Sequence, residues 1–279
     1  MSSTSKPRNS SDSEVVIEVR EFVAEYEGVR VLDGLDFDVH RGEIFVILGG
    51  SGCGKSTLLK HMIGQYEPAS GRIAFDGQDL VTARGSERLA ILRRLGVSYQ
   101  NGALFGSMTL LENVRVPLEE FTALPDEAMN WIARMKLERV GLLDFVDHLP
   151  NEISGGMQKR AAIARAMALE PDVVFLDEPS AGLDPITSAE LDDLIIDLAR
   201  DLDITFVIVT HELPSVYTIA DRVIMLDKRT KSIVATGKPS DLRDHAKDDW
   251  VRRFLTRGRD DDASAEIPCS DNSPDRNSS

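Results

Sequence analysis

The sequence contains few cysteines, few aromatic residues and no long apolar segment. Its 279 residues include two cysteines, and aromatic residues make up 6% of the chain. Cys53 and Cys269 lie far apart, so we expect no disulfide framework, which suits a reducing compartment. Apolar runs such as residues 206–209 are far shorter than the roughly 20 residues that a membrane-spanning helix needs. We therefore expect a chain that does not cross a membrane.

Basic residues are also scarce relative to acidic ones. The chain has 32 Lys and Arg residues against 47 Asp and Glu residues, which gives a formal net charge of −15. A surface of this sign repels nucleic-acid backbones and anionic lipid headgroups. We therefore expect no nucleic-acid partner.

The polar ends of the chain contrast with its middle. Residues 1–14 lack the apolar core of a secretory signal, and residues 256–279 are polar and acidic. Segments of this composition do not bury enough apolar surface to fold alone. We expect two disordered tails around one folded domain over residues 15–255, for which a hydrophobic content of 42% provides a sizeable core.

Short apolar runs rich in β-branched residues recur along this domain, at residues 44–48, 173–176, 206–209 and 223–226. Such runs are typical of strands that are covered on both faces, as in a parallel sheet flanked by helices. Helical periodicity marks residues 126–140 and 157–169, within a mainly helical insert, and a strand at 231–235 and a helix at 239–255 follow. The pattern predicts an α/β fold.

The first apolar run leads into a glycine-rich loop made of Gly49, Gly50, Ser51, Gly52, Cys53, Gly54, Lys55, Ser56 and Thr57. The order of strand, glycine loop and helix is typical of a triphosphate site, because the glycines let backbone N–H groups face the phosphates. We expect Lys55 to bridge the β- and γ-phosphates and Ser56 to bind Mg²⁺. We interpret Cys53 as a small residue accommodated in the loop rather than a redox switch.

An acidic pair, Asp177 and Glu178, follows the apolar run at 173–176. Ligands of open α/β sheets bind at the carboxyl ends of the strands, where these side chains emerge. We expect Asp177 to orient Mg²⁺ through water and Glu178 to accept a proton from the attacking water.

A second candidate phosphate site lies between these motifs in the chain. Ser154, Gly155, Gly156 and Met157 precede a predicted helix. Ser154 is suited to cap the N-terminus of that helix, and the glycines expose N–H groups at its positive end.

With these motifs the sequence resembles the ABC ATPases over residues 15–255. The resemblance implies a P-loop NTPase fold of the ABC type, with a central mainly parallel sheet, an N-terminal antiparallel β subdomain and a helical subdomain at about 101–168. It implies ATP and Mg²⁺ as cofactors, transmembrane permease subunits as partners, and a homodimer in which Ser154 and Gly156 reach the γ-phosphate bound by the partner. Met157 stands where Gln is usual, which affects only a peripheral contact.

Four further positions match the same family. Gln100 matches the glutamine that senses Mg²⁺ and the attacking water and communicates with the permease. Asp184 belongs to the matching D-loop at 180–184, and His211 matches the switch histidine that contacts the γ-phosphate. Tyr26 lies where the family places an aromatic residue that stacks on adenine, with a core role as the alternative.

Residues 100–118, QNGALFGSMTLLENVRVPL, are more specific to one type of transporter than the ATP-site motifs are. With HMIG at 61–64, the SGGM form of the signature and AGLDPI at 181–186, they resemble the ATPases of Mla-type lipid transport systems. Gly106 departs from the acidic residue expected there. The resemblance implies an Mla-type permease, an MCE-domain protein, and a location at the cytoplasmic face of the inner (plasma) membrane through the permease.

Other functions are open at this point. An ABC importer ATPase for amino acids or another small solute differs only in permease and cargo. A soluble ABC ATPase is less compatible with this sequence. DNA-repair members need a long coiled-coil insert and ribosome-associated members usually carry two cassettes, and neither feature fits here. A P-loop kinase or GTPase leaves the signature and His211 unexplained.

Overall fold

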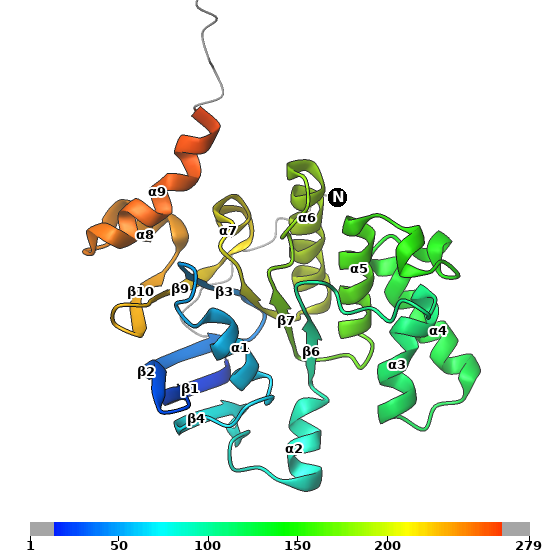
Figure 1. Ribbon diagram of the computed structural model, residues 1–279. Coiled ribbons are helices and arrows are strands. Elements are labelled where there is room, and N and C mark those ends of the chain that lie inside the picture. Colours follow the sequence, from blue (N-terminus) through cyan, green and yellow to red (C-terminus); the bar gives the residue numbers. More distant parts are fainter. Residues whose placement is uncertain (1–13, 264–279) are drawn as a thin grey trace, which may run out of the picture.

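Two sheets and a helical subdomain make up the computed structural model, which describes residues 14–263 (Figure 1). One sheet has six strands in the order β10-β9-β3-β8-β7-β6, and the other has four in the order β2-β1-β4-β5. The first is parallel from β9 to β6 with an antiparallel β10, and the second is antiparallel. The predicted α/β fold, with a mainly parallel sheet and a separate antiparallel sheet, is confirmed.

The six-stranded sheet contains the four predicted apolar strands. Its members are β3 (Ile44–Gly49), β6 (Leu95–Ser98), β7 (Val173–Asp177), β8 (Thr205–Val209), β9 (Arg222–Asp227) and β10 (Ser232–Gly237). Every residue of β3 and β8 is buried. Alternate side chains of β3 enter two different cores: Val46 and Leu48 contribute to one, and Phe45 and Ile47 to the other. Continuous hydrophobicity thus reflects burial on both faces.

The antiparallel sheet covers one of these faces. It comprises β1 (Val15–Tyr26), β2 (Val29–His40), β4 (Ser70–Phe75) and β5 (Gln78–Asp79). Its apolar residues share a core with Phe45, Ile47 and helix α1 (Lys55–Met62). The glycine-rich loop between β3 and α1 is therefore fixed at both of its ends by buried structure.

Helices cover the other face and form the lateral subdomain seen beside β6 in Figure 1. The helices after α1 are α2 (Gly85–Leu92), α3 (Leu110–Phe121), α4 (Asp126–Arg139), α5 (Gly155–Ala166), α6 (Pro185–Leu202), α7 (Leu213–Ile219), α8 (Pro239–His245) and α9 (Asp249–Ala263), with 3₁₀ turns at Leu143–Phe145 and Pro150–Glu152. The region of α3, α4 and α5 contains helices and turns, as predicted for the insert.

The prediction of one helix over residues 239–255 is wrong, because two helices occupy this region. The backbone of Ala246 is extended (φ −59°, ψ 137°), which ends α8. The carboxylate of Asp248 then accepts a hydrogen bond from the N–H of Trp250 at 2.7 Å, at the start of α9. Helix α9 continues to Ala263 and enters the segment 256–279 that we expected to be disordered. The remainder of that tail and residues 1–13 lie outside the described residues.

Strand β6 packs tightly against α5 through Gly96. A Cβ atom at this position would lie 2.3 Å from the carbonyl oxygen of Ala166. Since a backbone atom must move to relieve this contact, we expect Gly96→Ala to lower the free energy of unfolding by about 1–3 kcal/mol. Gly106→Ala is the matched control, because a Cβ there meets nothing within 4 Å. Urea unfolding checks both variants, and equal stabilities would contradict the packing of β6 on α5.

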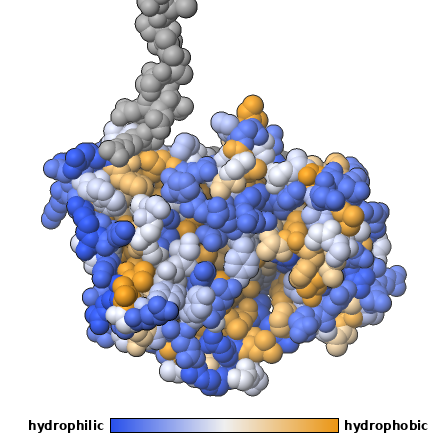
Figure 2. Space-filling view, in the orientation of Figure 1, coloured by the Kyte–Doolittle hydropathy of each residue, from blue (hydrophilic) through white to orange (hydrophobic). Residues whose placement is uncertain are grey.

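Within residues 14–263, no helix is long and apolar enough to span a membrane. The face of the molecule shown in Figure 2 is largely hydrophilic, with separate apolar spots over the helical subdomain and the C-terminal helices.

Candidate nucleotide-binding site

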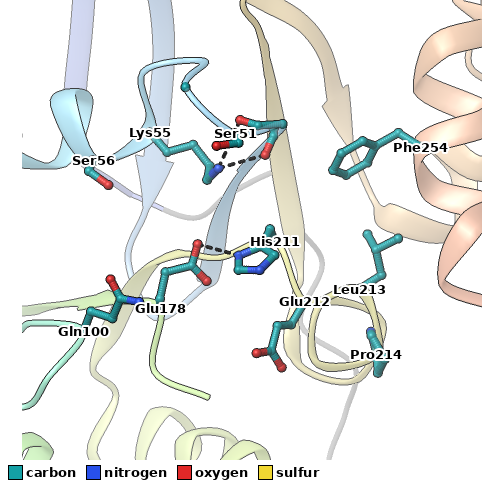
Figure 3. A pocket seen from close by; sticks show the side chains of 13 residues that line it. Ser51, Lys55, Ser56, Gln100, Glu178, His211, Glu212, Leu213, Pro214 and Phe254 are labelled. Atoms are coloured by element: carbon teal, nitrogen blue, oxygen red, sulfur yellow. Dashed lines mark hydrogen bonds and ion pairs between the residues drawn. The ribbon is translucent and has the colours of Figure 1, made fainter. Parts of the chain in front are cut away.

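A cleft of about 750 Å³ lies where β3, β7 and β8 end, and Figure 3 shows the side chains that line it. Its lining consists of Gly49, Gly50, Ser51, Gly52, Lys55, Ser56, Gln100, Glu178, His211, Glu212, Leu213, Pro214 and Phe254. The cleft therefore brings together predicted residues from four separate motifs: the glycine-rich loop, Gln100, the acidic pair and the switch histidine.

The glycine-rich loop lines this cleft and leads into the N-terminus of α1. Gly54 caps α1 with φ 105° and has no side chain to bond the first N–H groups of the helix. Such free N–H groups at a helix N-terminus bind anions. Gly49 is required for the tight turn, because a Cβ there would lie 2.4 Å from Cys53 Sγ and 2.6 Å from the carbonyl oxygen of Leu226. This geometry matches the predicted phosphate loop.

The ammonium group of Lys55 lies across the same loop. Its Nζ donates to the carbonyl oxygens of Gly49 at 2.8 Å and Gly50 at 3.4 Å (Figure 3). The cation is therefore held at the mouth of the loop, where it can pair with the negative charge of a phosphate chain.

Two other members of the loop motif, Cys53 and Thr57, are not among the residues that line the cleft. Cys53 is only 3% exposed, and burial raises the pKa of its thiol. A buried thiol with a raised pKa is poorly reactive, which supports the interpretation of Cys53 as a packing residue. Thr57 lies in the first turn of α1, where its carbonyl oxygen is 2.8 Å from His61 Nδ1.

The acidic pair is placed as the sequence predicted, at the end of β7. Glu178 adopts a left-handed backbone conformation with φ 47°, which is uncommon for a residue with a side chain. Its Oε1 lies 2.8 Å from His211 Nδ1, and its N–H donates to the carbonyl oxygen of Val209 at 2.8 Å. Residues from two neighbouring strand ends are thereby joined directly at the cleft.

Two buried carboxylate oxygens have no hydrogen-bond partner within the described part of the chain, namely Asp177 Oδ1 and Glu178 Oε2. Burial raises the pKa of Asp177, and the neighbouring Glu178 raises it further, while nearby lysines including Lys55 oppose the shift. A cation or a polar ligand would satisfy such oxygens and favour their charged form.

This donor set fits Mg²⁺. Ser56 and Gln100 line the cleft with a hydroxyl and an amide oxygen, and Asp177 adds a carboxylate with an unpartnered buried oxygen. Mg²⁺ prefers such hard oxygen ligands and typically takes the rest from water and substrate phosphates. Residues 14–263 contain no cluster of three or more His, Cys, Asp or Glu side chains placed to hold a metal by themselves.

The signature residues at 154–157 are not among the residues that line the cleft. Ser154 caps α5, as predicted, with its Oγ accepting from the N–H of Met157 at 3.3 Å. A Cβ at Gly156 would lie 2.4 Å from the Thr187 side chain, so a larger residue there would require that side chain to move. Ser154 and Gly156 line a separate hollow of about 230 Å³, with Gly155 between them in the sequence. The structure does not bring this motif to the cleft of its own chain.

Asp184 and Tyr26 also lie outside the lining of the cleft. Asp184 caps α6 by accepting from the N–H groups of Ile186 at 3.0 Å and Thr187 at 3.1 Å, and its hydrogen bonds with Thr187 are the main reason that its pKa is lowered. Tyr26 is 38% exposed at the end of β1, with its ring centroid 5.8 Å from that of Tyr66. Its adenine-stacking role stays a prediction.

The sequence analysis missed part of the cleft wall. Glu212, Leu213 and Pro214 follow the switch histidine directly, and the proline in the first turn of α7 was an available helix-start signal. Phe254 comes from α9 and had no local signal. It reaches the cleft because α9 packs on α7, where Tyr217 donates its hydroxyl to the carbonyl oxygen of Leu255 at 2.8 Å.

A glycine loop at a helix N-terminus, beside an acidic pair and a histidine at adjacent strand ends, defines a P-loop nucleotide hydrolase. Its subclass follows from comparison with known proteins. The ABC transporter family matches residues 32–181, so this chain belongs to the ABC transporter family. It is an ATP-binding subunit with the fold of an ATPase.

Its relatives include ATP-binding proteins of transport systems from several bacteria. The "Intermembrane phospholipid transport system ATP-binding protein MlaF" of Escherichia coli K12 is 43% identical over 226 residues, which are 81% of this chain and 82% of that protein. The "Probable ribonucleotide transport ATP-binding protein mkl" of Mycobacterium leprae is 39% identical over 245 residues, 88% of this chain and 70% of that protein.

Solved structures agree with this assignment. A dimeric structure of the ATP-binding cassette MJ0796, bound to ADP and Pi in a post-hydrolysis state, gives a TM-score of 0.72 with 29% identity and covers 80% of this chain and 98% of that one. The structure of cbiO1 from Clostridium perfringens, part of the ABC transporter complex cbiONQ, gives a TM-score of 0.76 with 29% identity, covering 88% and 96%. The predicted ATPase activity is thereby confirmed at the level of the family.

Proposed function

We propose that this chain is the ATP-hydrolysing subunit of a lipid transporter and that two copies close head-to-tail around two ATP molecules. One observation carries the dimer: Lys55, Glu178 and His211 share a cleft, whereas Ser154 and Gly156 line a separate hollow of the same chain. In a head-to-tail pair, the N-terminus of α5 from one copy faces the cleft of the other and supplies a second set of N–H groups to the phosphates.

The residues of the cleft have distinct roles in this proposal. Lys55 and His211 hold the γ-phosphate, and Ser56, Gln100 and Asp177 hold Mg²⁺, with Asp177 acting through water. When bound, the metal ion neutralises charge on the phosphate oxygens. Glu178 accepts a proton from the attacking water, and His211, 2.8 Å from its Oε1, helps to fix its orientation. Most of the rate acceleration comes from positioning and charge neutralisation.

The proposed transmembrane partner docks beside the cleft. An apolar groove of about 260 Å³ lies between β6 and the helical subdomain, and its lining includes Leu89, Val97, Pro117 and Phe121. β6 ends just before Gln100, so a permease segment seated in this groove would sense and move the Gln100 loop. The ATPase would thereby lie at the cytoplasmic face of the inner (plasma) membrane without spanning it.

Lipid cargo is supported by the relatives named MlaF and by residues 100–118. In this reading the permease is of the Mla type and works with an MCE-domain protein. The relative named for ribonucleotide transport supports a small-solute cargo as the second candidate.

Isolation of the native membrane complex in mild detergent, followed by mass spectrometry of proteins and lipids, tests the proposal. We expect an Mla-type permease and an MCE-domain protein to co-purify with this chain. Recovery of an amino-acid- or nucleotide-binding protein instead would move the assignment to a small-solute importer.

A matched pair of leucines tests the groove. Leu89 is 38% exposed in the groove, and Leu124 is 39% exposed between α3 and α4. We expect Leu89→Glu to release the permease, because it places a charge in the apolar contact, and Leu124→Glu to retain it. Retention of the permease by both variants would place the docking surface elsewhere.

A further inference from the structure

Helix α5 begins at the signature motif and also reaches the cleft of its own chain through Lys159. The ammonium group of Lys159 donates to the carbonyl oxygen of Gln100 and, at 3.4 Å, to that of Glu178. Both acceptors belong to residues that line the cleft. A single side chain of the helical subdomain thus joins two segments that carry the chemistry.

A second cation of α5 holds the same loop. Arg165 donates to the carbonyl oxygens of Gly102 and Ala103, each at 2.7 Å. The backbone that follows Gln100 is therefore attached to α5 at several points, and only Lys159 among these two cations also bonds the backbone of Glu178. Arg165 provides a comparison for the loop contact alone.

Lys159 lies among acidic side chains at the edge of the cleft. Burial lowers the pKa of its ammonium group, and the carboxylates of Asp177, Glu178 and Glu212 act in the opposite direction. The carbonyl oxygen of Glu178, which accepts from Lys159, belongs to a residue in the uncommon left-handed conformation, with φ 47°. A small rotation there would move the carboxylate relative to His211.

We propose that Lys159 is a positioning residue for ATP hydrolysis: it fixes Gln100 and Glu178 relative to the signature helix, so that movement of the helical subdomain reaches the residues around the attacking water. Lys159 acts through these two residues and does not touch the nucleotide. The inference rests on the roles proposed above for Gln100 and Glu178. It adds an intrachain path to the contact that α5 makes with the partner subunit.

Steady-state kinetics of the purified full-length chain test this role. Because misplacement of a reacting group by about 1 Å can cost about 100-fold in rate, we expect Lys159→Met to lower kcat for ATP by about tenfold or more. KM and the melting temperature should stay near wild type, since the phosphate loop is intact. Lys159→Arg should recover most of kcat, because a guanidinium can bond both carbonyl oxygens.

Two further variants separate the explanations. Lys228→Met makes the same change at an exposed lysine between β9 and β10 and should leave kcat unchanged. Arg165→Met removes only the contacts to Gly102 and Ala103 and should lower kcat less than Lys159→Met. A normal kcat in Lys159→Met would overturn the proposal. A lower kcat, a higher KM and a lower melting temperature in both Lys159 variants would also overturn it, because they would indicate a general structural role.

Measurement of Glu178→Gln in the same assay distinguishes two failures. If Glu178→Gln is inactive while Lys159→Met is normal, the positioning role alone is wrong. If Glu178→Gln turns over normally, the assignment of Glu178 fails, and with it the basis of the Lys159 proposal.

Discussion

Glu178→Gln is expected to bind ATP and to lose hydrolysis by about 100-fold or more, because general-base catalysis contributes roughly 10²–10⁴-fold. The amide is nearly isosteric with the carboxylate and can still bond His211, which lies 2.8 Å from Glu178 Oε1. It cannot accept a proton from water. Since hydrolysis reopens the proposed dimer, the variant should also accumulate as a closed, ATP-loaded pair.

Phosphate release measures the turnover of this variant, and size-exclusion chromatography with light scattering in the presence of ATP measures its assembly. Glu138→Gln, at an exposed position of α4, is the control and should behave as wild type. Normal phosphate release by Glu178→Gln would rule out Glu178 as the base. Loss of hydrolysis without a stable dimer would leave the base in place and count against the closed ATP-loaded pair.

Ser154→Arg is expected to leave ATP binding by the single chain intact and to abolish dimer-dependent hydrolysis. Ser154 lies at the N-terminus of α5, outside the cleft that holds Lys55 and Ser56. A long cationic side chain there would occupy the space through which the helix approaches the partner's phosphates. Loss of the cap also destabilises the helix by about 1 kcal/mol, which is small against the stability of a domain of this size.

Binding of a fluorescent ATP analogue and phosphate release are the two measurements for this variant. Ser240→Arg, in the first turn of α8, controls for an added charge at another exposed helix start. Full hydrolysis by Ser154→Arg would contradict the head-to-tail arrangement. Loss of nucleotide binding would mean that the signature region supports the cleft of its own chain instead.

Sequence patterns predicted the strands that are buried on both faces along their whole length. Strands β3 and β8 are buried along their whole length, so their apolar runs were visible without any tertiary information. The strands of the antiparallel sheet were expected only from the family resemblance. In β2, exposed acidic residues such as Asp33 interrupt the apolar pattern, because its outer face meets solvent.

The residues of the candidate site also fall into two groups, those that a local motif predicts and those that only tertiary contacts bring in. Lys55, Glu178 and His211 sit at strand or helix ends, so a local motif was enough to find them. Phe254 and Lys159 join the site through contacts between elements distant in the chain, which no short pattern encodes. The break between α8 and α9 was missed for a related reason, since no glycine or proline marks it and the turn depends on Ala246 and Asp248.

The placement of the phosphate loop and the signature loop on separate hollows of one chain has a genetic consequence. In the proposed head-to-tail dimer, a defect in Lys55 and a defect in Ser154 would inactivate different halves of the composite sites. When two such copies pair, one composite site receives both defects and the other receives neither. Two alleles that are each inactive alone would thus complement each other within the same gene. Each mixed pair would contain one working site.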